Sequence, residues 1–465
     1  MNAPTIWIVT PATVAVLLFV IRNPRALSIF GGLVASLLAI SAQFIPIDEA
    51  LRFGIYSLKI DATLDVFGRV LRIQPAEGSL LAIIYGAAAL WFFGAEASGS
   101  AEHVVPYGLL ITTLMVAAIA VEPFLFAALF IELAVLLAVP MLTSIHRLPG
   151  RGVVRFLIYQ TLAIPFILLS GWLLAGVEAS PGDVGLAAQA GSMLGLGFAF
   201  LLAIFPFYNW IPLLIEESSP FLVGFLLWIL PTITIIFGVG FLDRYSWLRS
   251  SPQTISTLQF VGLVMIVTGG VWAATERHLG RIMAYVSVTE TGFSILAMSL
   301  DLKVGISILF LFLPARALGL AVWSLALTVL QQNGESLRFS AVRGLLRRFP
   351  FAGTAAILAA LSASAFPLLA GFPARLALWE NLARVSTNAA FWLGVGIIGL
   401  FTSCFRSMAV LSMADEYTDW EVHEDWLQGI MLGLGVIGLF GLGLFPQFVQ
   451  YFLSGLPAMF DHLGR

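Results

Sequence analysis

Long apolar runs recur along the whole chain and decide what it can fold into. A helix that crosses the roughly 30 Å hydrocarbon core of a bilayer needs about 20 apolar residues, and the sequence contains about fourteen such candidates. In lipid the backbone must satisfy its hydrogen bonds internally, so these runs are predicted to be helices. Only 11% of the 465 residues are charged, against about 25% in soluble domains. We therefore predict an all-α polytopic membrane protein and exclude a large soluble enzyme.

The predicted spans cover residues 6–21, 27–45, 80–93, 104–121, 123–143, 153–174, 187–211, 221–242, 258–274, 281–300, 304–330, 351–383, 388–413 and 429–453.

Basic residues are divided unequally between alternate loops, which predicts the orientation of the helices. One set of loops, predicted to be cytoplasmic, carries Arg22, Arg25, Arg147, Arg151, Arg155, Arg277, Arg281, Arg338, Arg343, Arg347 and Arg348. The other set carries fewer basic residues, and in the segment 52–72 acidic residues partly offset them. Loops rich in Lys and Arg normally stay in the cytoplasm. An even number of spans then places both termini on the opposite side.

Two predicted spans each contain a pair of prolines six residues apart. Pro206 and Pro212 lie in the seventh span, and Pro367 and Pro373 lie in the twelfth. Proline removes a backbone donor and clashes with the preceding turn, so we predict broken helices, with ordinary kinks as the alternative. The repeated spacing also predicts two five-helix copies, inverted relative to each other, as in many transporters.

This repeat divides the chain into four parts. Residues 1–103 hold helices 1–3, and residues 104–245 hold the first copy, helices 4–8. Residues 256–413 hold the second copy, helices 9–13. Residues 414–465 hold an acidic loop at 415–425 and helix 14. The loop is predicted to be solvated, with docking of a neighbouring subunit as the alternative.

Among the ionisable residues inside the predicted spans, five are singled out as candidates, because a charge costs at least about 2.5–3.5 kcal/mol at a helix centre. Glu132, Glu290 and Arg316 are central in spans five, ten and eleven. Arg375 follows the break in span twelve, and Arg406 lies in span thirteen. Each is either functional or part of a structural ion pair or a snorkelling contact. We favour function for Glu132 and a structural role for Arg406.

Other patterns argue against cofactor, metal and nucleic-acid sites in this chain. Cys404 is the only cysteine, and the five histidines lack metal-ligand spacing, so iron–sulfur, zinc and haem sites are not predicted. The basic residues are scattered, which speaks against nucleic acid. The segment 433–438 spells G-x-G-x-x-G inside an apolar run, where close helix packing explains it better than dinucleotide binding.

Several segments together resemble a known family. Residues 275–292 read TERHLGRIMAYVSVTETG, residues 205–212 read FPFYNWIP, and residues 344–350 read GLLRRFP, followed by a proline and an AGF triplet near position 370. These resemble motifs of the antiporter-like membrane subunits of respiratory NADH:quinone oxidoreductase (complex I). Arg155 with its two successors resembles a helix-six element, and residues 401–408 resemble a helix-thirteen element of the N-type subunit. Fourteen helices also fit that family.

The resemblance implies a buried proton relay and assigns residues to it. The helix-five glutamate of the family matches Glu132, but its lysine partner on helix seven falls at Leu201 and a further lysine near Thr232. The positions on helices ten, eleven and twelve match Glu290, Arg316 and Arg375. A buried lysine can approach neutral pH and exchange protons, whereas an arginine stays charged. We therefore predict Glu290 as the titrating group, tuned by Arg316 and Arg375. Supporting roles are predicted for Arg155, Arg406 and the four prolines.

The resemblance further implies a bacterial-type plasma (inner) membrane and other membrane subunits as partners. Proton translocation would be coupled to electron transfer in partner subunits that handle NADH and quinone, with no redox site here. Close alternatives are subunits of related hydrogenases, multisubunit cation/proton antiporters and bicarbonate-uptake complexes. A structural subunit with a degenerate proton path also stays open. An intramembrane enzyme such as a lipid transferase would need clustered Asp or His near one interface, which the sequence lacks.

Overall fold

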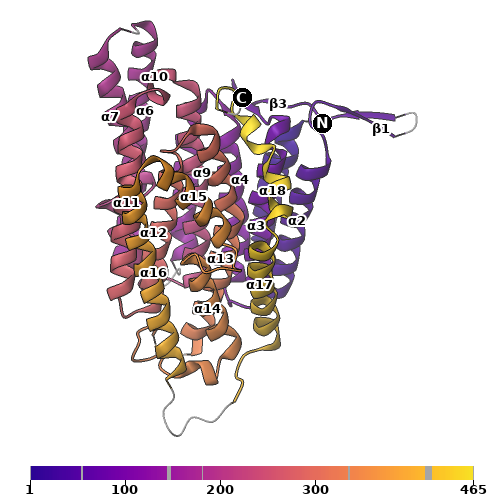
Figure 1. The fold of residues 1–465 in the computed structure, drawn as a ribbon. Coiled ribbons are helices and arrows are strands. Elements are labelled where there is room, and N and C mark those ends of the chain that lie inside the picture. Colours follow the sequence, from indigo (N-terminus) through magenta and orange to yellow (C-terminus); the bar gives the residue numbers. More distant parts are fainter. Residues whose placement is uncertain are drawn as a thin grey trace.

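Long helices build one upright bundle in the computed structural model (Figure 1). It describes residues 2–53, 56–66, 68–143, 148–180, 182–333, 336–413 and 421–463. His146, Arg147 and most of the predicted acidic loop lie outside these ranges.

In chain order the helices are a π-helical turn (Thr5–Val9), α1 (Thr10–Leu18), α2 (Pro24–Phe44), α3 (Gly78–Gly94), α4 (Ala101–Ala120), α5 (Ala127–Leu142), α6 (Arg151–Ala179), α7 (Val184–Leu201), α8 (Trp210–Glu217), α9 (Pro220–Arg244), α10 (Ser246–Arg249), α11 (Pro252–Thr275), α12 (Leu279–Ala297), α13 (Leu302–Asn333), α14 (Pro350–Ala363), α15 (Phe372–Val385), α16 (Thr387–Ser412), α17 (Trp426–Leu444) and α18 (Pro446–Leu453). Every predicted span overlaps at least one of them.

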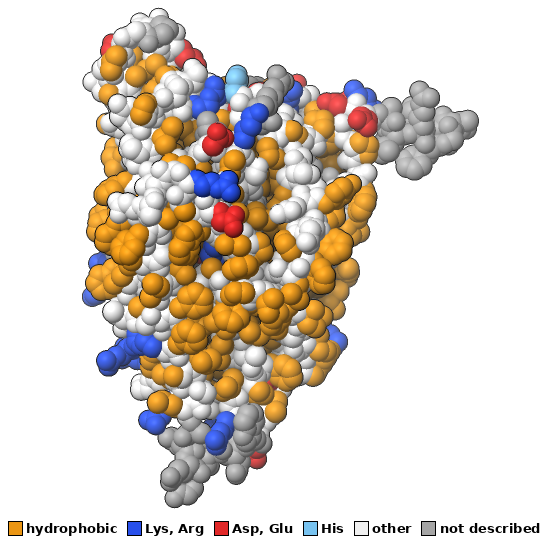
Figure 2. Space-filling model, viewed as in Figure 1, with side chains coloured by type: hydrophobic (Ala, Val, Ile, Leu, Met, Phe, Trp, Pro, Cys, Tyr) orange, Lys and Arg blue, Asp and Glu red, His pale blue; other side chains and the backbone are white. Residues whose placement is uncertain are grey.

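The polytopic membrane class is confirmed. In the described part of the chain, 11 helices are long and apolar enough to cross a membrane, and shorter apolar helices cover Thr5–Leu18 and Pro350–Ala363. Hydrophobic side chains cover most of the visible face between the two ends of the bundle, and most basic side chains lie nearer the ends (Figure 2). The count of fourteen spans remains a prediction.

Short strands occupy the segment that follows α2, where only a loop was expected. β1 (Ala50–Phe53) pairs antiparallel with β2 (Tyr56–Lys59), and β3 (Thr63–Val66) pairs antiparallel with β4 (Arg69–Arg72). β4 also pairs with β5 (Val121–Glu122) at the end of α4. The β1–β2 hairpin extends sideways from the bundle (Figure 1).

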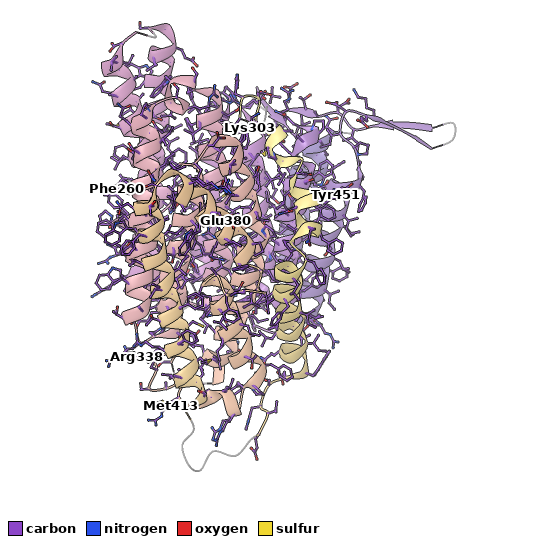
Figure 3. The ribbon with its side chains drawn as sticks, in the orientation of Figure 1. Phe260, Lys303, Arg338, Glu380, Met413 and Tyr451 are labelled. Atoms are coloured by element: carbon purple, nitrogen blue, oxygen red, sulfur yellow. The ribbon has the colours of Figure 1, made fainter. Side chains whose placement is uncertain are left out.

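Both termini lie at one end of the bundle (Figure 1), as an even number of spans requires. Lys303 lies near this end, and Arg338, from the arginine-rich set of loops, lies near the other (Figure 3). Arg338 and the termini are therefore at opposite ends of the bundle, and the side of the membrane that each end faces stays a prediction.

The prediction of two broken spans is confirmed. The seventh span is interrupted between α7 and α8, and the twelfth between α14 and α15. In each break one proline lies between the half-helices and the other in the first turn of the second half-helix, where a missing N–H costs nothing. Left-handed backbone at Ala203 in the first break, and at Ala365 and Leu368 in the second, turns the chain out of its helix.

The two broken spans run in opposite directions. The turn before α7 is at the end that carries the termini (Figure 1). Gly344, shortly before α14, is hydrogen-bonded to Val410, close to Met413 at the other end (Figure 3). Inverted copies require this arrangement. The division into two five-helix units and its boundaries remain a prediction.

Helix α12 lies at the centre of the bundle. It contacts α8, α9, α11, α13, α14, α15 and α16, and nearly all its side chains from Ile282 onward are buried. It is not among the 11 candidate spans, because its serines, threonines and Glu290 lower its hydropathy. Neighbouring helices shield these polar groups from lipid.

Two of the three glycines at 433–438 serve helix packing. A Cβ on Gly435 would come closer than 3.0 Å to Val322, and one on Gly438 equally close to Leu318. Both contacts are with α13, so the two glycines let α17 approach α13 closely.

Candidate functional site

Three of the predicted charged residues meet at the centre of the bundle. Glu290 on α12, Arg316 on α13 and Arg375 on α15 are 6%, 4% and 3% exposed. Nη2 of Arg375 donates a hydrogen bond to Oε1 of Glu290, which makes a buried ion pair. The guanidinium also lies over the ring of Phe293, 5.0 Å from its centroid. We call these three residues the central cluster.

The break in the twelfth span holds Arg375 in place. Its Nη1 donates to the carbonyl of Ser362 at 3.1 Å and to that of Gly371 at 2.9 Å. Ser362 lies at the carboxyl end of α14, where helix carbonyls carry partial negative charge that favours a cation. A Cβ on Gly371 would lie closer than 3.0 Å to both Arg375 and Ser362. The position therefore needs glycine, and the break supplies both acceptor and space.

A proline on the neighbouring helix α9 helps to hold Arg316. Its Nη2 donates to the carbonyl of Leu227 at 2.9 Å and to Oγ1 of Thr291 at 3.1 Å. In a regular helix the carbonyl of Leu227 would accept the N–H four residues later, but that residue is Pro231, inside α9. Pro231 thus leaves an acceptor free within the membrane, and Arg316 uses it.

Two small cavities adjoin Arg316. One, of about 10 Å³, is lined by Glu290, Arg375, Ser362 and others. The second, of about 20 Å³, faces the first copy, and its lining includes Gln160, Leu201 and Trp210. A cavity needs about 10–15 Å³ of such volume to hold a water. Arg316 therefore lines two separate spaces of about water size.

Glu132 lies apart from the central cluster. It is half-buried on α5, and its Oε1 accepts a hydrogen bond of 2.8 Å from Thr161 on the exposed side of α6. Its Oε2 is buried without a partner. Within the described residues no cation forms an ion pair with it. The structure therefore does not join Glu132 to Glu290, Arg316 and Arg375.

At the lysine position of helix seven, Leu201 is buried at the end of α7. The nearby polar group is Gln160 of α6, which is 2% exposed and donates to the carbonyl of Leu201 at 3.1 Å. Thr232, near the other lysine position, is buried, and its hydroxyl has no partner. The first copy offers polar groups here that do not titrate.

The remaining predicted residues lie outside the cluster. Arg155 is exposed on α6. Arg406 donates to the carbonyl of Ala274 at the end of α11 and covers the ring of Phe339, which supports a structural role. Pro206 and Pro367 lie in the two breaks, and Pro212 and Pro373 lie in the following first turns.

The sequence reasoning missed several residues that build the site. Ser362, Gly371, Pro231 and Gln160 hold the arginines or line the cavities, and a proline inside an apolar span was the signal for Pro231. Glu380 was overlooked although it lies in the twelfth predicted span. It is exposed on α15, well between the two ends (Figure 3).

The end of the bundle opposite the termini carries an ion-pair network. Glu216 pairs with Arg281 at 2.5 Å and with Arg338 at 3.7 Å. Next to it, His278 caps α12 by accepting the backbone N–H of Arg281. Burial lowers the pKa of His278 below its ordinary value, although the charge of Glu216 opposes this. His278 is therefore held neutral.

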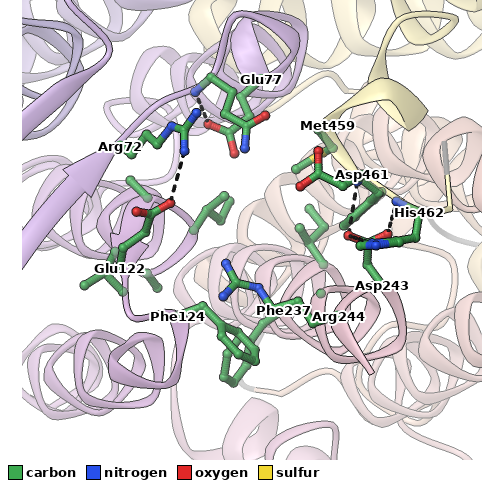
Figure 4. Close-up of a pocket in the computed structure, with 18 residues that line it drawn as sticks. Arg72, Glu77, Glu122, Phe124, Phe237, Asp243, Arg244, Met459, Asp461 and His462 are labelled. Carbon is green, nitrogen blue, oxygen red and sulfur yellow. Dashed lines mark hydrogen bonds and ion pairs between the residues drawn. The ribbon is translucent and has the colours of Figure 1, made fainter. Parts of the chain in front are cut away.

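The end that carries the termini contains a polar cavity of about 400 Å³ (Figure 4). Arg72 faces Glu122 across 3.7 Å, and Arg244 lies over the ring of Phe124. Asp243 accepts backbone N–H groups from residues 461–463, which fixes the C-terminal segment over the cavity. In the described residues no group of three or more His, Cys, Asp or Glu side chains is placed to hold a metal ion.

Comparison with known proteins points to the same family as the sequence motifs. The family model described as NADH:quinone oxidoreductase/Mrp antiporter, TM, matches residues 183–402. "NADH-quinone oxidoreductase subunit 14" of Thermus thermophilus is 26% identical over 67% of this chain and 70% of its own length. "NADH-quinone oxidoreductase subunit N 2" of Acidobacterium capsulatum is 25% identical over 85% and 84%. Two other subunit N relatives are matched over 54% and 50% of their own length.

Among solved structures, a chain of the archaeal membrane-bound sulfane sulfur reductase superposes with a TM-score of 0.82. The sequences are 15% identical, and the superposition covers 100% of this chain and 98% of the other, so the likeness shows the fold alone. The family match, the subunit N relatives and the shared fold agree with one another. The chain is therefore similar to the antiporter-like membrane subunits of the NADH:quinone oxidoreductase and Mrp antiporter family, and several of the relatives that it resembles are N-type subunits of complex I.

Proposed function

We propose that this chain is the antiporter-like subunit of a complex I-type NADH:quinone oxidoreductase, and that it takes part in proton translocation through Glu290. The observation that carries the proposal is the burial of this carboxylate between two guanidinium groups at the centre of the bundle. A charge at this depth is costly and is retained for a role. Glu290 is the one member of the cluster that can release and rebind a proton, because arginines stay charged.

The geometry gives Arg375 the role of a gate. While it pairs with Glu290, it stabilises the carboxylate, so proton uptake requires the pair to loosen. The carbonyls of Ser362 and Gly371 already accept from the same guanidinium and hold it during that step. Arg316, on the other side, stays fixed by Leu227 and Thr291 and keeps positive charge beside both small cavities. A small shift of the Arg375 guanidinium towards or away from Glu290 then decides whether Glu290 holds a proton.

The proposed function also implies a membrane, an orientation and partner subunits for this chain. The membrane is a bacterial-type plasma (inner) membrane, and both termini lie on its non-cytoplasmic side. Other membrane subunits flank the chain, and partner subunits carry NADH, quinone and the redox cofactors. Helices 4–8 and 9–13 form two inverted copies that meet at the central cluster. The opposite directions of the two broken spans support this.

A second candidate is a subunit without a proton path of its own. Leu201 at a family lysine position, and the distance in the fold between Glu132 and the cluster, favour it. Membership of a related complex, such as a cation/proton antiporter or a sulfur-reducing assembly, is supported by the family description and the shared fold. Purification of the native complex with its soluble partners distinguishes these assemblies.

Replacement of Glu290 by Gln tests the proposal in the purified complex reconstituted into liposomes. We expect fewer protons moved per electron, with the complex still assembled. Glu380→Gln is the matched control, because it makes the same change on an exposed carboxylate of α15. Unchanged proton movement in Glu290→Gln would favour the structural candidate.

A further inference from the structure

We propose that the larger cavity beside Arg316 binds a small monatomic anion such as chloride. This junction cavity, of about 20 Å³, lies between the two proposed copies. Gln160, Leu201 and Trp210 line it from one side, and Ser287, Thr291 and Arg316 from the other. A binding site for an anion goes beyond the proposed function and does not depend on it.

The charges at the centre of the bundle do not balance. Among the described residues, the buried charged side chains at mid-depth are one carboxylate, Glu290, and two guanidinium groups, Arg316 and Arg375. Arg375 takes the carboxylate as its ion-pair partner. The partners of Arg316 are a carbonyl and a hydroxyl, neither of which carries a charge. An uncompensated buried charge is costly, so an anion beside Arg316 would stabilise the cluster.

Two buried N–H donors on the cavity wall have no hydrogen-bond partner. They are Nε of Arg316 and Nε1 of Trp210, and each residue is 4% exposed. Buried polar groups are almost always paired, and a pair of free donors beside a cation is the arrangement that an anion satisfies. The donors come from the two different copies, α8 and α13, so one bound particle would link both.

The other groups on the wall do not compete for this role. The hydroxyl of Ser287 donates to the carbonyl of Met283, and that of Thr291 donates to the carbonyl of Ser287. The amide nitrogen of Gln160 is used on the carbonyl of Leu201. None of the described residues that line the junction cavity is acidic. The cavity therefore lacks a negative charge beside its cation and hydrogen-bond acceptors for its free donors.

The size of the cavity selects the kind of anion. A volume of about 20 Å³ is close to what a single water needs. A monatomic halide is only slightly larger than a water, whereas gluconate is a chain of many atoms and does not fit. Chloride or bromide should therefore bind, and gluconate should not.

Thermal unfolding of the purified full chain in detergent tests this site. Sodium chloride or bromide replaces sodium gluconate at constant ionic strength, and the midpoint is followed against halide concentration. We expect a saturable rise, as mass action requires for a ligand that binds the folded state. Trp210→Phe keeps an aromatic side chain but removes the N–H, and we expect the apparent Kd to rise about tenfold, the loss expected for a hydrogen bond to a charged group.

Trp228→Phe is the matched control. Trp228 is also buried with an unpartnered Nε1, but it stacks on Trp91 at 5.1 Å and does not line the junction cavity. Its variant should keep the halide response of the wild type. No saturable response in the wild type, or an equal loss in both variants, would overturn the proposal.

A direct measurement covers the case in which Trp210→Phe unfolds. Crystals grown in bromide should show an anomalous-scattering peak between Arg316 and Trp210. Bromide peaks confined to other places would equally overturn the anion site.

Discussion

Replacement of Gly371 by Ala tests how the broken helix holds Arg375. A Cβ at this position would lie closer than 3.0 Å to Nη1 of Arg375 and to the carbonyl of Ser362. To reach an ordinary contact of 3.4 Å, the distance from the added methyl to each of these groups must grow by more than about 1 Å, and overpacked cores relax by such shifts at a cost. The side chain of Arg375 gives way more easily than the backbone of Ser362. It then loses hydrogen bonds of 3.1 and 2.9 Å and strains its pair with Glu290.

The expected cost follows from these contacts. Overpacking costs about 1–3 kcal/mol, and loss of one partner in a buried ion pair costs about 3–5 kcal/mol. Because the pair is strained and not removed, we expect a loss of about 2–4 kcal/mol in the free energy of unfolding. Proton translocation by the complex should fall together with it.

Denaturant unfolding in detergent, with proton uptake into liposomes measured in parallel, checks this result. Gly441→Ala is the matched control, because no atom lies within 4 Å of its added Cβ in α17. Alanine there should stabilise the helix by up to about 1 kcal/mol and leave transport unchanged. If Gly371→Ala behaves like Gly441→Ala in both measurements, the structure gives the wrong reason for glycine at 371.

Three further predictions concern single contacts. In Pro231→Ala, the new backbone N–H of residue 231 competes with Arg316 for the carbonyl of Leu227. Helix α9 should be at least as stable as in the wild type, but proton movement should fall. Proton movement equal to that of the wild type would contradict the anchoring role of this carbonyl. Burial lowers the pKa of His278 in the folded chain, so below the ordinary value of 6.5 the unfolded chain binds more protons than the folded one. The contribution of His278 to the free energy of unfolding should therefore be complete above pH 6.5 and fall on acidification. His278→Asn keeps a capping acceptor and should flatten that slope between pH 7 and 5 in thermal unfolding. Asp243→Ala removes the acceptor for residues 461–463, so hydrogen exchange at these amides should speed up by about tenfold or more; unchanged exchange would show that Asp243 does not hold the C-terminal segment.

Much of the fold is predictable because lipid leaves the backbone few choices. Runs of apolar residues predicted the helices, and paired prolines at 206 and 212 and at 367 and 373 predicted both breaks. The strands after α2 were missed because they lie outside the apolar spans, where this constraint no longer acts. Helix α12 was predicted as the apolar span 281–300, but its central place in the bundle depends on neighbours far apart in the sequence.

The site was predictable only in part. Charge within a span identified Glu290, Arg316 and Arg375, because burying charge is costly wherever it occurs. The same rule did not reveal that Glu132 lies towards the outside of the bundle, because packing between helices sets which face of α5 is turned inward. Anchors such as the free carbonyl of Leu227 arise from a proline on another helix. Such pairings need three-dimensional structure.

Infrared difference spectroscopy of the complex during turnover tests the central claim most directly. If Glu290 binds and releases a proton, a carboxyl C=O band should appear and disappear with turnover in the wild type and in Glu380→Gln, and should be absent in Glu290→Gln. A band that persists in Glu290→Gln, or no carboxyl band in the wild type, would show that Glu290 keeps one protonation state and does not carry the proton.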